Sequence, residues 1–252
     1  MKTKMKVFLA ASAVAVVSSA VIIAGEYNKK KKEKIVLPEK FTLTAHTGCE
    51  GTVDNSLEAI TKGFECGADI VEFDINFNAE GVPVLAHDKA LENSVTLDEA
   101  FSLIAGYGNL RVNVDCKTTQ NLKAIVLLAE KHGVLDRIFY TGIEEKDVDA
   151  VKAQTPDVAY YLNTPVKKSR NRSYLISLAD KVEAHGAVGI NMNHKNCSKE
   201  LVSVFHERGL LVSIWTVNSE IDMLKKLPLG ADNITTRHPD KLKNLIKAKT
   251  SK

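Results

Sequence analysis

The sequence has 252 residues, of which 44% are hydrophobic and 26% are charged, which is ordinary for a globular chain and enough for one hydrophobic core. The net charge of +3 comes from the N-terminus, because residues 1–36 hold eight Lys and two Glu and the rest of the chain therefore carries about −3. That charge gives no indication of nucleic-acid binding. The four cysteines have no CxxC or Cys/His spacing, so we expect no structural zinc site, and nothing in the sequence indicates an obligate protein partner.

The N-terminus has the pattern of a membrane segment. A basic start precedes nineteen residues without a charge, 7–25, and a helix of that length nearly crosses the hydrocarbon core of a bilayer. We therefore expect residues 1–25 to form a signal anchor that attaches the protein to a membrane by this single helix. Residues 26–40 would form a basic linker, and the domain 41–252 would lie outside the cytoplasm. A cleaved signal peptide is the alternative, since residues 18–20 form an acceptable cleavage site, and cleavage would make the protein secreted.

Strand and helix patterns alternate along the chain from residue 41 onward. The predicted strands are 41–46, 70–77, 111–117, 137–143, 158–163, 188–193, 210–218 and 232–236. Eight such units in about 210 residues predict an α/β fold, a (β/α)8 TIM barrel whose parallel strands are joined by right-handed crossovers. An open doubly wound sheet is the alternative, but no G-x-G-x-x-G opens a helix after a strand, as a dinucleotide-binding fold would require.

One short β segment, 81–88, departs from this alternation. It follows the strand 70–77 after the turn sequence NAEG, so we expect a small β-excursion above the barrel rim. Active sites of such barrels lie at the C-terminal ends of the strands, and the excursion would bring His87 and Asp88 to that end.

Polar side chains gather on the inward faces of the predicted strands, near their C-terminal ends. Side chains in a strand repeat every two residues, so Glu72 and Asp74 point to the same face. The inward residues at this end include His46, Glu72, Asp74, Asp115, Lys117 and Trp215. Three carboxylates in one cavity repel one another unless a cation lies between them, and oxygen ligands favour a hard divalent cation, Mg²⁺ or Ca²⁺.

Other polar residues have structural explanations or an open role. Three histidines fall in last helical turns before Gly, where a cation suits the helix dipole: His132, His185 and His206. Asn55, with Glu58 three residues later, has the form of a helix-capping arrangement. His194 and His238 follow the sixth and eighth predicted strands, near the expected mouth of the barrel, where either could touch a substrate.

Four short motifs occur in a fixed order in the segment AHTGCEGTVDNSLEAITKGFECGADIVEFDINFNAEGVPVLAHD, and VNVDCK, IWTVN and GADNITTRHPD follow. This order resembles the glycerophosphodiester phosphodiesterase family, whose pattern runs H-R-G, P-E-N, E-x-D and H-D, and the resemblance covers residues 41–245. It implies a (β/α)8 barrel that uses a divalent metal and two histidines to hydrolyse glycerophosphodiesters to an alcohol and glycerol 3-phosphate. In the family mechanism the substrate's glycerol hydroxyl attacks phosphorus and gives a cyclic phosphate, which water then opens.

The resemblance implies roles for individual residues. The residues that match the family's metal ligands are Glu72, Asp74 and Asp115, and those that match its two catalytic histidines are His46 and His87. Lys117 matches the phosphate-side lysine, and Trp215 matches the aromatic wall of the pocket. One histidine must accept the proton of the attacking hydroxyl and the other must protonate the leaving alcohol. The sequence leaves open which does which.

Four positions depart from the family pattern. Thr47 replaces the Arg of H-R-G, a guanidinium that usually grips the phosphate. Asp54 replaces the Glu of P-E-N, and Asp115 is one methylene shorter than the usual third ligand, Glu. Arg237 replaces an Asp near the end of the last strand. We expect Thr47, Arg237 and His194 to lie beside the substrate, where Arg237 or His194 could supply the missing charge.

Two alternatives to hydrolysis are open at this point. A related cyclising lyase, of the sphingomyelinase D-like kind, would stop at the cyclic phosphate; such relatives also use Asp as third ligand, but they lack the VLAHD arrangement. A non-catalytic anchored binding domain of the same fold is the second alternative, motivated by Thr47. A glycosidase does not fit, because its acid and base must flank a sugar.

Overall fold

The structure is a computed structural model that describes residues 34–169 and 171–250. The predicted anchor, 1–25, and most of the predicted linker, 26–40, lie outside these residues, so membrane attachment stays a prediction. Among the described residues no helix is both long enough and apolar enough to cross a membrane.

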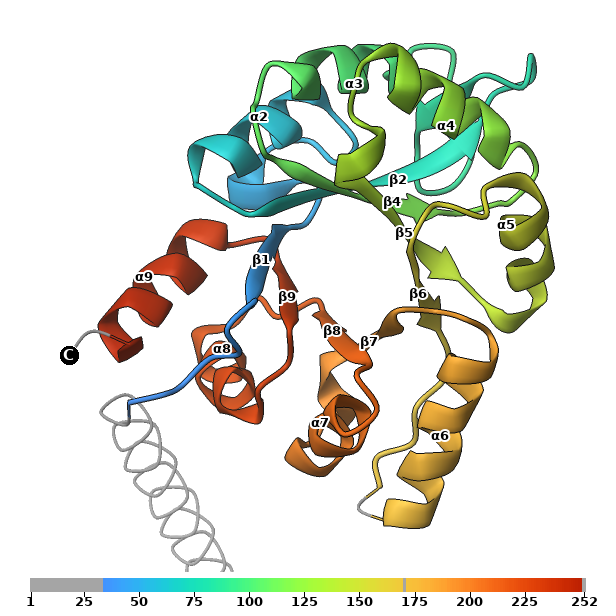
Figure 1. Cartoon of the computed structure of the whole chain (residues 1–252). Coiled ribbons are helices and arrows are strands. Elements are labelled where there is room, and N and C mark those ends of the chain that lie inside the picture. Colours follow the sequence, from blue (N-terminus) through green and yellow to red (C-terminus); the bar gives the residue numbers. More distant parts are fainter. Residues whose placement is uncertain (1–33, 170, 251–252) are drawn as a thin grey trace, which may run out of the picture.

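Eight parallel strands close into a barrel with helices packed around its outside (Figure 1). The barrel strands are β1 (Thr42–Ala45), β2 (Ile70–Phe77), β4 (Arg111–Cys116), β5 (Ile138–Ile143), β6 (Tyr160–Asn163), β7 (Gly189–Asn193), β8 (Leu211–Trp215) and β9 (Asn233–Thr236). Strand β1 pairs with both β2 and β9, which closes the sheet and excludes the open doubly wound alternative. The predicted TIM-barrel architecture is thus confirmed.

The largest difference between a predicted and an observed strand is at β8. The sequence pattern predicts a strand over 210–218, but β8 ends at Trp215. The next residues instead bond to the end of β9, because the Val217 amide donates to the Thr235 carbonyl (2.9 Å) and the Asn218 side chain accepts from the Arg237 amide (2.8 Å). The regular strand therefore ends at Trp215, at the mouth, and the residues after it stay attached to β9 and the residue that follows it.

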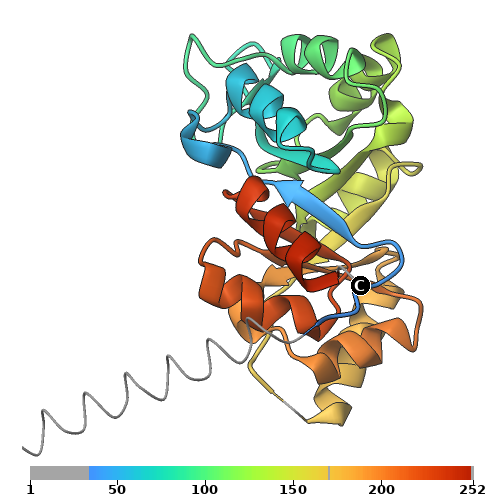
Figure 2. The ribbon, with the colours of Figure 1, turned by 90° about the vertical axis from the view of Figure 1, so that its left-hand side faces the viewer.

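The α-helices are α2 (Leu57–Glu65), α3 (Leu97–Ala105), α4 (Leu122–Lys131), α5 (Val148–Gln154), α6 (Arg172–Ala184), α7 (Lys199–His206), α8 (Glu220–Lys226) and α9 (Pro239–Thr250). Side-chain oxygens cap several N-termini, as in α3, where Thr96 and Glu99 form a capping box. The predicted helix-end positions of His132, His185 and His206 are confirmed. Helix α9 lies beside β1, so the two ends of the described chain meet on one side of the barrel (Figure 2).

The main hydrophobic core lies between the barrel and its helices, while the barrel interior is largely polar except for a small cluster of Ile70, Phe139 and Tyr161. Outward residues such as Phe73 and Ile75 are almost fully buried under the helices. Inside, the side-chain amide of Asn233 donates to the hydroxyls of Thr42 (2.9 Å) and Thr44 (2.7 Å). The alternation of strand side chains therefore sends apolar groups outward and gives the interior a polar lining that leads up to the mouth.

The predicted β-excursion is present as β3 (Pro83–Leu85), which pairs antiparallel with the end of β2. The Ala86 amide donates to the Asp74 carbonyl (3.0 Å), so the chain stays attached to β2 beyond the strand itself. This attachment holds the following residue, His87, beside the C-terminal end of β2.

Candidate active site

Three carboxylates converge at the C-terminal end of the barrel. Glu72 and Asp74 lie on the inward face of β2, and Asp115 lies opposite Asp74 on β4. One oxygen from each of the three carboxylates lies within 4.8 Å of the others. The sequence prediction that these side chains share one face is therefore correct.

The electrostatics of this group depend on burial and mutual repulsion. Burial raises the pKa of Glu72 well above its usual value, and the charges of Asp74 and Asp115 raise it further. Burial would also raise the pKa of Asp74, but the Lys117 ammonium and the side-chain amide of Asn55 outweigh burial, so the pKa of Asp74 is lowered. The donor set consists of carboxylate oxygens with an excess of negative charge, which fits a hard divalent cation.

A hydrogen-bond donor holds one oxygen of each carboxylate. The Thr47 amide donates to Glu72 Oε2 (3.0 Å), and the Asn55 side chain donates to Asp74 Oδ2 (2.9 Å). On the third carboxylate, the Thr141 hydroxyl donates to Asp115 Oδ1 (2.7 Å). The orientation of all three carboxylates is thus set by neighbouring protein groups, as is usual for metal ligands.

The structure corrects the role predicted for Asn55. The sequence pattern pairs Asn55 with Glu58 as a helix cap, but the cap of α2 is Ser56, whose hydroxyl accepts from the Ala59 amide (3.1 Å). Asn55 instead has a φ of 56° and bonds twice to Asp74, because its Oδ1 also accepts from the Asp74 amide (2.9 Å). Asn, Asp, Ser and Thr all suit an N-cap, so propensity alone could not choose between the neighbouring residues 55 and 56.

Thr141 is a further residue of the site that the sequence analysis does not predict, although the sequence contains a signal for it. It lies on β5 in register with Asp115, and its hydroxyl bonds to both Asn113 (2.8 Å) and Asp115. Applying the two-residue alternation to the strand 137–143 would have placed it on the inward face.

His46, the residue after β1, is a partly buried member of the site. Its Nδ1 lies 2.7 Å from the Thr47 carbonyl oxygen and 3.8 Å from Glu72 Oε2. A carbonyl only accepts, so the proton of the neutral ring is on Nδ1 and Nε2 is left as the acceptor. Burial lowers the pKa of His46; the Thr47 hydrogen bond opposes this shift, and the charge of Arg237 adds to it. The ring is thus neutral near pH 7.

His87 follows β3 and is more exposed. Its Nδ1 lies 2.8 Å from Asp88 Oδ1, and its side chain is 66% exposed. The Asp88 carboxylate can accept the Nδ1 proton and balance the charge of a protonated ring. His46 and His87 therefore differ in environment, one sheltered and neutral, the other open and beside a carboxylate.

A cavity of about 410 Å³ joins these groups. Seven of the predicted site residues line it: His46, Glu72, Asp74, His87, Asp115, Lys117 and Trp215. Lys117 bridges two of the carboxylates, with Nζ 2.8 Å from Asp74 Oδ1 and in contact with Asp115 Oδ2. Trp215, the last residue of β8, is 36% exposed and offers an aromatic wall at the mouth.

Three other predicted substrate-binding residues are not among the lining residues. Thr47 is buried, and its hydroxyl accepts from the backbone N–H of Asn55. His194 is buried in a short 3-10 helix after β7, and within the described part of the chain its Nδ1 has no hydrogen-bond partner. Arg237 forms a two-point ion pair with Asp54, with Nη1–Oδ1 of 2.7 Å and Nη2–Oδ2 of 3.0 Å.

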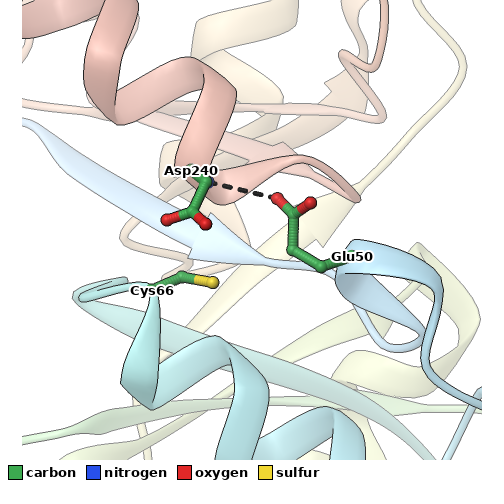
Figure 3. A group of neighbouring side chains, drawn as sticks. All are labelled: Glu50, Cys66 and Asp240. Carbon is green, nitrogen blue, oxygen red and sulfur yellow. Dashed lines mark hydrogen bonds between the residues drawn. The ribbon is translucent and has the colours of Figure 1, made fainter.

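A second grouping of possible ligands lies on the outside of the barrel, where Glu50, Cys66 and Asp240 approach one another (Figure 3). The Glu50 carboxylate accepts from the Asp240 amide (3.2 Å) and so caps the start of α9. Burial, followed by the nearby Asp240 charge, raises the pKa of the Cys66 thiol to about 11, so the thiol is protonated near pH 7. A helix cap and a neutral thiol account for this grouping, and we assign no site to it.

Comparison with known proteins identifies the family. The model of the glycerophosphoryl diester phosphodiesterase family matches residues 44–123 and 107–241. A glycerophosphodiester phosphodiesterase of Caldanaerobacter subterraneus is 25% identical over 248 residues, which is 82% of this chain and 98% of that protein.

Solved structures agree in fold. A putative glycerophosphodiester phosphodiesterase from Galdieria sulphuraria superposes with a TM-score of 0.70 at 23% identity, covering 86% of this chain and 100% of that one. A phosphodiesterase from Oleispira antarctica, solved with the product sn-glycerol 3-phosphate, gives 0.67 at 22% identity over 84% of this chain and 97% of that one. The matched segments contain the carboxylates and histidines of the cavity, and the chain therefore belongs to the glycerophosphoryl diester phosphodiesterase family of enzymes.

Proposed function

We propose that the protein hydrolyses glycerophosphodiesters to an alcohol and glycerol 3-phosphate with the help of one divalent cation, Mg²⁺ or Ca²⁺. The observation that carries the proposal is the convergence of three carboxylates and two histidines on one cavity at the barrel mouth. Family membership supports it, as does the product bound in the Oleispira antarctica relative.

The three carboxylates would hold the cation. Glu72, Asp74 and Asp115 offer hard oxygen ligands already oriented by hydrogen bonds. A bound divalent cation would offset the negative charge of the phosphate oxygens as the reaction proceeds. The proton transfers fall to the protein's own side chains.

The two histidines divide these transfers according to their surroundings. Nε2 of His46 accepts the proton of the glycerol hydroxyl as that oxygen forms a bond to phosphorus, because Nδ1 already donates to the Thr47 carbonyl. His87, whose charged form Asp88 balances, donates its Nε2 proton to the alcohol oxygen as the bond from that oxygen to phosphorus breaks. Water then opens the cyclic phosphate: His87 takes a proton from water, and His46 returns its proton to the glycerol oxygen.

The direct test is an assay of the full chain in detergent, with glycerophosphodiesters of different alcohols and with Mg²⁺, Ca²⁺, Mn²⁺ or EDTA. Phosphorus NMR of the products distinguishes glycerol 3-phosphate from a cyclic phosphate that accumulates. Accumulation of the cyclic product would instead favour the lyase alternative, and no turnover under any condition would favour the binding domain.

The pH dependence of catalysis follows from the environment of His46. A general base works in its neutral form, so kcat/KM rises as the pH rises through the pKa of His46. Because burial and Arg237 lower this pKa from 6.5, we expect the acid-side midpoint of the kcat/KM profile below pH 6.5. Removing the positive charge in Arg237→Gln should move that midpoint upward. A midpoint that stays in place in Arg237→Gln would contradict this coupling.

Arg237 is our candidate for the phosphate-binding guanidinium that is missing at position 47, where Thr replaces the Arg of the family pattern. The guanidinium lies above Gly48, since a Cβ built there would be 2.5 Å from Arg237 Nη1 and 1.9 Å from Asp54 Oδ1. Gly48 has a φ of 68°, so both its conformation and the missing side chain make room for the pair. The guanidinium is thereby held in the loop that follows His46.

Arg237→Gln is therefore expected to raise KM for a small diester, with a loss of kcat/KM of roughly ten- to a hundredfold, the range of a charge-assisted contact. Thr47→Arg is expected to be neutral or harmful, because position 47 is buried and its hydroxyl bonds to the Asn55 amide. Arg172→Gln, which breaks an exposed ion pair with Glu207 on the helix side, is the control. A higher kcat/KM in Thr47→Arg, together with an unchanged kcat/KM in Arg237→Gln, would reject the proposal that Arg237 takes the role of the arginine missing at position 47.

A further inference from the structure

The Lys117 ammonium lies within the group of carboxylates that would hold the cation. Lys117 directly follows β4, and its amide donates to the Ile75 carbonyl (3.0 Å), so its backbone is fixed against β2. From there Nζ reaches Asp74 Oδ1 at 2.8 Å and contacts Asp115 Oδ2. The side chain is 23% exposed and lines the cavity, so the ammonium has space on the cavity side.

The two oxygens that Lys117 contacts are those left free by the rest of the site. Asn55 holds the other oxygen of Asp74, and Thr141 holds the other oxygen of Asp115. The oxygens that face Lys117 are thus those of Asp74 and Asp115 that no other side chain of the site holds. A divalent cation held by the same two aspartates would compete with the ammonium for their negative charge.

We infer that Lys117 competes with the divalent cation for Asp74 and Asp115, and that binding of the cation turns the ammonium toward the substrate phosphate. This inference rests on the metal-dependent function proposed above. The Lys117 ammonium lies between the Asp74 and Asp115 carboxylates, and both form an ion pair with it. A displaced ammonium repelled by the cation is stabilised by an anion in the cavity. Metal binding and phosphate binding therefore strengthen each other, and by linkage the effect is reciprocal.

The test is metal binding by the full chain, measured by isothermal titration calorimetry without turnover. Mg²⁺ or Ca²⁺ is titrated into the parent and into Lys117→Met, with and without a fixed concentration of glycerol 3-phosphate. Without glycerol 3-phosphate, Lys117→Met should bind the ion more tightly than the parent, by roughly 5- to 150-fold, the usual range of such couplings. Glycerol 3-phosphate should tighten metal binding by the parent clearly more than by the variant, because only the parent also places an ammonium beside the phosphate.

Lys131→Met is the matched control, because Lys131 forms an ion pair of similar length with Asp98 (2.7 Å) on the outside of the barrel. This variant should have the metal affinity of the parent both with and without glycerol 3-phosphate. Equal or weaker metal binding by Lys117→Met would overturn the inference while leaving the metal site itself in place. If no ion binds the parent at all, the metal-dependent function fails first. The metal affinity of the parent is also compared with and without glycerol 3-phosphate, which needs no variant. If glycerol 3-phosphate leaves this affinity unchanged, the inference is overturned.

Discussion

Changing Glu72 to glutamine is expected to remove both the activity and the stabilisation that a divalent cation confers, while the barrel still folds. A ligand at a hundredfold excess over its Kd stabilises the native state by about 2.7 kcal/mol. For a domain of this size that corresponds to a rise in Tm of about 5–10 °C, because 1 kcal/mol shifts Tm by about 2–4 °C. We expect this rise in the parent and none in Glu72→Gln, measured by thermal unfolding with Mg²⁺, Ca²⁺ or EDTA.

The same variant should be at least as stable as the parent without metal. The pKa of Glu72 is raised in the folded state, so its contribution to stability is full at low pH and is lost as the pH rises through that pKa. Glutamine keeps an oxygen for the Thr47 backbone amide and cannot take the ionised form that Asp74 and Asp115 repel. Glu65→Gln, at an exposed position of α2, should leave both properties unchanged. Full activity in excess EDTA, with a Tm that no metal moves, would reject the carboxylate site.

Changing His46 or His87 to alanine is expected to lower kcat by about two to four orders of magnitude, the usual contribution of a positioned acid or base. The double variant should lose much less than the product of the two single effects, because residues that act as a unit are not additive. Steady-state kinetics of the three variants under saturating metal would show this. Near-normal turnover in either single variant would remove that histidine from the mechanism. His132→Ala, which alters only a pair with Asp98 at the end of α4, should keep its rate.

The arrangement within single strands was predictable from the sequence, and contacts between distant segments were not. The two-residue period of a strand is enough to place Glu72 and Asp74 on one face of β2, and the predicted parallel barrel adds Asp115 from the neighbouring strand; the three do converge in the structure. The pairing of Arg237 with Asp54 joins positions 183 residues apart, and no local pattern carries that information. The proton position on His46 depends on one carbonyl, which only coordinates can place.

Helix ends show the same limit on a smaller scale. Two neighbouring residues, Asn55 and Ser56, both suit the start of α2, and the choice between them depends on Asp74, which lies on another element. The segment after the end of β8 at Trp215 is likewise held by a distant segment, because the Asn218 side chain accepts from the backbone amide of Arg237. In both cases a tertiary contact decides between options that local propensity leaves nearly equal.

The ion pair above Gly48 also has a consequence for how this chain could have evolved. Asp54 and Arg237 fill the space over that glycine, next to position 47 in the chain. If Arg237 binds the phosphate as proposed, substitutions at positions 47, 54 and 237 should not act independently, because Asp54 holds the guanidinium in place. A chain that once carried arginine at position 47 would then have needed Arg237 before, or together with, the loss of that arginine to stay active throughout. Reconstructed intermediates that carry neither arginine should therefore be the least active on the path.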